Sequence, residues 1–105
     1  MTHRIAFSLE LPGENAAEYQ RRHDELWPEL REAIRQQGGR NYTIFAAPEI
    51  DRVFGYLEVD DLERWNSGAG TELTHAWWRH MADLMPTNPD GSPVGTPLHE
   101  VFHQA

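Results

Sequence analysis

The order in which strand-like and helix-like hydrophobic patterns follow one another restricts the fold of this chain more than any other feature. Apolar residues recur at every second position in residues 4–11, which predicts a half-buried strand. Residues 14–37 have a helical period instead, and the Gly38-Gly39 pair is a typical helix stop. Residues 40–46 and 53–59 are rich in β-branched and aromatic side chains and predict a hairpin.

Two further helices and a strand are expected in the rest of the chain. Asp60 or Asp61 can cap a short helix, and Thr71 can cap a longer one that reaches Met85. Turn-forming residues then fill positions 86–97 and predict an ordered loop over the body. A last strand is predicted over the segment LHEVFH, numbered 98–103.

The resulting order is β, α, β, β, α, β within 105 residues, which predicts one domain over residues 1–105. This order matches the split βαβ arrangement of ferredoxin-like α+β folds, with an antiparallel sheet and helices on one face. The other sheet face then needs a cover, and a second copy of the chain is the natural one. We therefore expect a homodimer of the dimeric α+β barrel kind, in which two sheets face or join each other.

Pro28 falls inside the first helical stretch. A proline at this position cannot donate its backbone hydrogen bond, and its ring crowds the carbonyl of Asp24. We expect either a kink or two short helices that meet near Trp27, with Asn15 as the cap of the first.

Charge and composition exclude several classes of partner. The net charge of −8, from 17 acidic and 9 basic residues, disfavours binding to nucleic acid and to anionic membrane surfaces. The sequence has no cysteine, which excludes disulfides, thiolate metal sites and a cysteine nucleophile. No apolar run approaches the roughly 20 residues that span a bilayer, so a soluble cytoplasmic protein is expected.

One face of the first helical stretch combines apolar residues with groups that exchange protons. On a helical wheel a narrow stripe contains Tyr19, His23, Leu26, Leu30 and Ile34, with Trp27 at its edge. A lone histidine on such a face is commonly a core residue held by a structural hydrogen bond. Here Tyr19 lies one turn before His23, and Pro28 opens the helix one turn after it, which favours a polar notch instead.

The second long helix contains two adjacent tryptophans that cannot both point into one core. Its inward stripe comprises Leu73, Trp77, His80, Met81 and Leu84, and Trp78 lies about 100° away from Trp77. In one interpretation Trp77 and Trp78 divide between the core and a contact with the dimer partner or the 86–97 loop. In the other they line a carbohydrate site, to which Tyr42 adds a phenolic hydroxyl.

The histidines do not form a metal-binding pattern. His75 and His80 are five positions apart on a helix, and His99 and His103 on a strand would lie about 13 Å apart. Phosphate-binding glycine loops and nucleophile elbows are also absent from the sequence. The remaining chemistry is acid/base catalysis without a cofactor or metal.

A spaced set of motifs along nearly the whole chain resembles the L-rhamnose mutarotase family. The motifs are EYQRRH at 18–23, LWPEL at 26–30, NY at 41–42, ERWN at 63–66, WWRHMADLMPTNPDGSP at 77–93 and LHEVF at 98–102. The resemblance implies a dimeric ferredoxin-like fold that interconverts the α and β anomers of L-rhamnose without a cofactor. By position, it implies that His23 is the general acid and that the sugar is bound by Tyr19, Tyr42, Trp77 and Trp78.

Histidine suits this reaction because its unperturbed pKa, near 6.5, lets it give and take a proton at neutral pH. Three alternatives remain from the sequence: a cofactor-independent monooxygenase of the same fold, a sugar-binding module without turnover, and a bare dimerisation domain.

Overall fold

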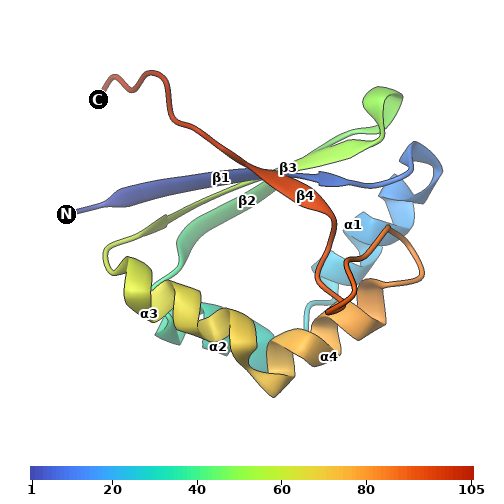
Figure 1. Cartoon of the computed structure of the whole chain (residues 1–105), viewed down its shortest axis with the longest axis horizontal. Helices are drawn as coiled ribbons and strands as arrows, with labels where there is room; N and C mark the ends of the chain where they lie inside the picture. Colours follow the sequence, from blue (N-terminus) through green and yellow to red (C-terminus); the bar gives the residue numbers. More distant parts are fainter.

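The computed structural model describes residues 1–105, except for the side chain of Ala69. A four-stranded antiparallel sheet has the order β2-β3-β1-β4, and its strands are β1 (His3–Glu10), β2 (Arg40–Ala47), β3 (Arg52–Val59) and β4 (Gly95–Leu98). The helices all lie on one side of this sheet (Figure 1): α1 (Ala16–Asp24), α2 (Pro28–Gln36), α3 (Leu62–Ser67) and α4 (Glu72–Met81). Short 3-10 turns are η1 (Gly13–Asn15), η2 (Pro48–Ile50) and η3 (Gly68–Gly70). The predicted ferredoxin-like order is confirmed.

The strand alternation separates an inner from an outer sheet face. On the inner side of β3, Val53, Leu57 and Val59 are at most 1% exposed. Gly55 lies between them, where a side chain would collide with the ring of Phe7 on β1. The core continues under α1 and α4 through Leu11, Tyr19, Met81, Leu84 and Met85. None of the described helices has the length and apolar character of a bilayer-spanning segment.

Pro28 divides the first helical stretch, as predicted, into two helices. Trp27 is the N-cap residue of α2, and Pro28 occupies its first turn, where the missing N–H costs no hydrogen bond. Gly38 ends the second helix with a φ of 90°, which glycine adopts without a steric penalty. Asn15 is the N-cap residue of α1, as predicted, but its side chain makes no capping hydrogen bond and donates instead to the carbonyl of Leu84 at 2.8 Å.

The second long helix begins at the predicted cap but ends early. The Thr71 hydroxyl accepts a hydrogen bond from the backbone N–H of Thr74 at 3.2 Å. The helix then ends at Met81, four residues before the predicted end. Beyond Met81 the chain forms a 3-10-type turn, in which the N–H of Leu84 donates to the carbonyl of Met81, three residues earlier. The Arg22 side chain on α1 binds the carbonyl of His80, which a helix continuing to Met85 would use internally for the N–H of Leu84. Asn15 binds the carbonyl of Leu84 in the turn beyond α4.

The last strand lies earlier than predicted. Regular pairing with β1 covers Gly95–Leu98, and the predicted strand over residues 98–103 is wrong. Beyond Leu98 the tail is held to β1 by side chains, because Arg4 donates to both carboxylate oxygens of Glu100 at 2.6 and 3.0 Å. Pro97 is tolerated because β4 is an edge strand, which does not need every N–H for pairing.

Candidate functional site

A cavity of about 1040 Å³ lies between the inner sheet face and the helices. Its size falls at the upper end of the roughly 300–1,000 Å³ typical of small-molecule sites. The five side chains predicted from the sequence all line it: Tyr19, His23, Tyr42, Trp77 and Trp78. They come from α1, β2 and α4, so the cavity is assembled from segments far apart in the chain.

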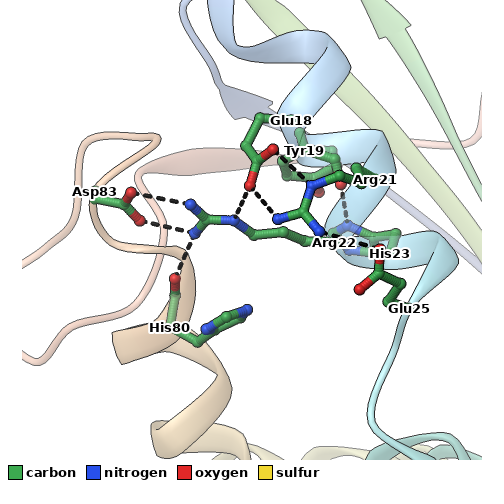
Figure 2. A network of polar contacts seen from close by, with 8 residues as sticks. All are labelled: Glu18, Tyr19, Arg21, Arg22, His23, Glu25, His80 and Asp83. Carbon is green, nitrogen blue, oxygen red and sulfur yellow. Dashed lines mark hydrogen bonds and ion pairs between the residues drawn. The ribbon is translucent and has the colours of Figure 1, made fainter.

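The ring of His23 is held by a backbone hydrogen bond within the last turns of α1. Its Nδ1 lies 2.9 Å from the carbonyl oxygen of Tyr19, one turn earlier (Figure 2). A carbonyl oxygen can only accept, so Nδ1 carries the hydrogen in this arrangement. The other nitrogen, Nε2, is therefore the one available to take up or release a proton.

Burial also shifts the titration of His23. Partial desolvation lowers the pKa of His23 below its usual value of 6.5, while the bond to Tyr19 and the nearby Asp24 carboxylate act in the opposite direction. The neutral ring therefore predominates at neutral pH, with a bare Nε2 in the cavity. Protonation at lower pH converts the same atom into a proton donor.

Tyr19 lies directly beside His23 and is 7% exposed. The two rings stack with centroids 4.3 Å apart and planes 28° from parallel. Desolvation, with a smaller contribution from Tyr42, raises the pKa of Tyr19 well above its ordinary range. Its hydroxyl therefore remains protonated at neutral pH and can act as a hydrogen-bond donor.

Tyr42 reaches the cavity because β2 is irregular at its start. The pairing of β2 with β3 shifts between Arg40 and Thr43, and Asn41 in the shift has a φ of 52°. Such a bulge changes the direction in which the following side chain points. The Tyr42 ring packs edge-on against Phe7, with centroids 6.3 Å apart, and desolvation raises the pKa of Tyr42 to about 12.

The two adjacent tryptophans on α4 have different surroundings. Trp77 packs against the buried core and meets His23 edge-on, with centroids 5.4 Å apart. Trp78 stacks on His75 at 5.1 Å, with planes 20° from parallel. Both tryptophans line the cavity, although only Trp77 packs against the buried core.

His80 was predicted to lie on the inward stripe of α4, and this prediction is wrong. Its side chain is exposed, although its ring remains 5.3 Å from those of Trp27 and Trp77. The helix ends one residue later, which places His80 at the margin of the packed layer. Within the described part of the chain, no group of three or more histidines and carboxylates is placed to hold a metal ion.

The cavity also contains polar residues that the sequence analysis did not select. Gln20 and Asp24 on α1 line it beside His23, and Asn66 and Thr74 line it from α3 and α4. A helical wheel could have indicated Gln20, which lies three residues before His23. Asn66 and Thr74 carry no comparable local signal, because their position depends on how α3 and α4 pack over the sheet.

Comparison with known proteins gives a consistent result. The family model described as L-rhamnose mutarotase matches residues 4–104. The L-rhamnose mutarotase of Lachnoclostridium phytofermentans is 50% identical over 100 residues, which is 95% of this chain and 96% of that protein. The L-rhamnose mutarotase of Tolumonas auensis is 48% identical over 97% of this chain and 98% of its own length.

Solved structures agree with this comparison. The crystal structure of L-rhamnose mutarotase from Formosa agariphila has a TM-score of 0.88 and 38% identity, covering 98% of this chain and 99% of that one. A putative antibiotic biosynthesis monooxygenase from Nitrosomonas europaea has a TM-score of 0.63 at 11% identity, covering 99% of this chain and 94% of its own. That second likeness concerns the fold alone.

Proposed function

Because this chain belongs to the L-rhamnose mutarotase family, we propose that it interconverts the α and β anomers of L-rhamnose. A pyranose changes anomer by opening to the free aldehyde, rotating about the exposed carbon and closing again. Opening requires a proton to reach the ring oxygen while another leaves the anomeric hydroxyl. The observation that carries the proposal is a histidine with an available Nε2, placed in an aromatic-walled cavity.

In this proposal His23 protonates the ring oxygen through Nε2 as the bond from that oxygen to the anomeric carbon breaks. The anomeric hydroxyl passes its proton to solvent water or to the Asp24 carboxylate, which also lines the cavity, and both protons return when the ring closes. The bond from Nδ1 to Tyr19 keeps the ring in one orientation, so each proton exchange occurs at the same atom. General acid/base assistance of this kind contributes roughly 10²- to 10⁴-fold. That gain is sufficient because mutarotation already proceeds unaided in water. No metal or cofactor is part of the proposed mechanism.

The other lining residues are proposed to bind the sugar. Tyr19 and Tyr42 keep their hydroxyl protons at neutral pH and can donate hydrogen bonds to sugar hydroxyls. The flat faces of Trp77 and Trp78 suit the C–H faces of a pyranose and exclude water from the reacting atoms.

The proposed activity can be measured directly by NMR saturation transfer between the two anomeric protons of L-rhamnose. The exchange rate is expected to rise in proportion to the protein concentration, above the rate in buffer. Other 6-deoxy and ordinary pyranoses, tested under the same conditions, then define the sugar preference. An exchange rate equal to that of the buffer at every protein concentration contradicts the proposal.

The pH dependence of anomer exchange reports the protonation state of His23. After subtraction of the uncatalysed rate, kcat/KM is expected to fall as pH rises through a value below about 6.5, because Nε2 loses the proton that it donates. This fall in kcat/KM with rising pH should be absent from the His23→Asn variant. An increase in kcat/KM over the same range would instead assign Nε2 as a base to the anomeric hydroxyl.

We also propose that the protein is a homodimer associated through the outer sheet face. All helices lie on the other side of the sheet (Figure 1). Phe45, which is 66% exposed, lies opposite Phe54 on the outer face, and Leu98 there is 42% exposed. Exposed apolar side chains on a sheet face without covering helices favour burial against a second copy.

A single charge on the outer sheet face is expected to break the dimer. Phe45→Glu should convert a species of twice the 12.1 kDa chain mass into a monomer, because a carboxylate would be buried without a partner. Ile50→Glu is the matched control, since Ile50 is 60% exposed in η2 and lies outside the sheet face. Light scattering after size exclusion measures both. A wild-type monomer, or a dimer that Phe45→Glu leaves intact, contradicts this interface.

We further propose that the protein acts in the cytoplasm, in rhamnose metabolism, where it supplies either anomer to enzymes that accept one form. The cysteine-free sequence is compatible with a reducing compartment.

A further inference from the structure

Two adjacent arginines on α1 differ in their partners: one binds only nearby residues of its own helix, and the other also binds a distant segment of the chain. Arg21 and Arg22 both bind the carboxylate of Glu18, at 2.6 and 2.8 Å. The Arg21 side chain is 55% exposed, and its other partner is Glu25 at the end of the same helix. The Arg22 side chain is 13% exposed, and its remaining partners are His80 at the end of α4 and Asp83 in the turn that follows.

The Arg22 guanidinium binds a backbone carbonyl at the end of α4 and a carboxylate in the turn that follows α4 (Figure 2). Nη1 donates to the carbonyl oxygen of His80 at 2.7 Å. Nη1 and Nη2 also donate to the two carboxylate oxygens of Asp83 at 2.8 and 3.0 Å. A planar guanidinium with two parallel bonds fixes direction as well as distance, so the two helices have a defined mutual position here.

The two helix turns that Arg22 connects are those that carry the reacting histidine and its aromatic wall. His23 is the next residue on α1, and Trp77 lies three residues before His80 on α4. The rings of His23 and Trp77 meet edge-on, at 87° between planes. Arg22 itself is not among the described residues that line the cavity.

We propose that Arg22 is a positioning residue, which holds α1 against α4 so that His23 faces the substrate at a fixed distance from Trp77. This inference rests on the proposed function of the cavity. Arg22 acts through geometry rather than through its charge, because Glu18 and Asp83 neutralise the guanidinium where it lies. Displacements of about 1 Å from such a change can cost on the order of 100-fold in rate.

The test compares Arg22→Gln with Arg21→Gln. Both variants remove one positive charge and one partner of Glu18, but Arg22→Gln alone removes the bonds to α4. We expect Arg22→Gln to lower kcat for anomer exchange by roughly 10- to 100-fold, with KM within about threefold of wild type. Arg21→Gln should retain wild-type kcat. The unfolding midpoint of each variant is measured as a control, and it must lie well above the assay temperature so that kcat refers to folded protein.

A second readout follows His23 itself. The ring protons of His23 sense the ring currents of Tyr19 and Trp77, so their NMR shifts are expected to move in Arg22→Gln and to stay in place in Arg21→Gln. If wild type does not accelerate anomer exchange, the proposed function fails. The positioning role is then decided by these shifts alone: movement supports it and no movement overturns it.

Arg22→Lys gives an intermediate case. A lysine ammonium lacks the planar fork that binds Asp83 through two parallel bonds, so a partial loss of kcat is expected. If Arg22→Gln does not fold, Arg22→Lys decides, since a reduced kcat at an unchanged unfolding midpoint supports positioning. A folded Arg22→Gln protein with the kcat of Arg21→Gln overturns the proposal, as does an Arg22→Lys protein with wild-type kcat.

Discussion

Replacing His23 by asparagine is expected to reduce the catalysed exchange of L-rhamnose anomers by about 10²- to 10⁴-fold, to the level of the uncatalysed reaction. The asparagine amide can still donate to the carbonyl of Tyr19, as Nδ1 does, so the end of α1 should keep its conformation. What the variant loses is Nε2, the nitrogen that exchanges a proton with the sugar. Saturation transfer between the anomeric protons measures the loss.

Sugar binding should largely survive this substitution, because the tyrosines and tryptophans remain in place. Binding can be followed by tryptophan fluorescence or by the rise in unfolding temperature on addition of L-rhamnose. His80→Asn is the matched control: it also removes an imidazole near Trp77, but the side chain is exposed at the end of α4. Full activity in His23→Asn, or an equal loss in His80→Asn, would remove His23 from its assigned role.

The second large effect is expected from the adjacent tryptophans, substituted one at a time. Trp77→Ala removes contacts with the buried core, with His23 and with Trp27, so it should destabilise the fold more than Trp78→Ala. Buried Trp→Ala changes typically cost about 3–5 kcal/mol, and Trp77 is half-buried, so a cost near the lower end is expected. Denaturant unfolding followed by circular dichroism measures the difference.

The two tryptophan variants should differ in stability but resemble one another in sugar binding. Both side chains line the cavity, so each substitution is expected to raise KM by at least several-fold, on the order of 1 kcal/mol for a lost aromatic contact. Trp78→Ala keeps the core intact and therefore isolates the effect on the site. Unchanged KM in a folded Trp78→Ala protein would exclude Trp78 from sugar binding.

Much of the fold could be predicted from the sequence because local patterns report local structure. The alternation of apolar residues identified the first strand, β-branched and aromatic content identified the next two, and helical spacing with cap residues identified the helices. Pro28 marked the break between α1 and α2. Asp61 and Thr71 were correct as caps, since a cap depends on hydrogen bonds within three residues. These features depend on a few neighbouring residues and can be recognised without knowledge of the rest of the chain.

The errors concern places where distant segments meet. At the end of α4 Arg22 binds the carbonyl of His80, and Asn15 binds that of Leu84 in the turn that follows; both bonds join residues about 60 to 70 positions apart in the chain. The position of β4 is determined by pairing with β1, which extends over Gly95–Leu98 despite the proline within it. Neither contact leaves a trace in the local pattern near residues 81 or 98.

The same division applies to the candidate site. Residue type and helical spacing on α1 and α4 were sufficient to select His23, Tyr19 and the tryptophan pair. Tyr42 was also predicted, but only the tertiary structure showed that it reaches the cavity through the bulge at Asn41 and that Nε2 is the available nitrogen of His23. Only the packing of α1 against α4 revealed the bridge from Arg22, because a sequence records which groups are present, whereas their distances are set by contacts between segments remote in the chain.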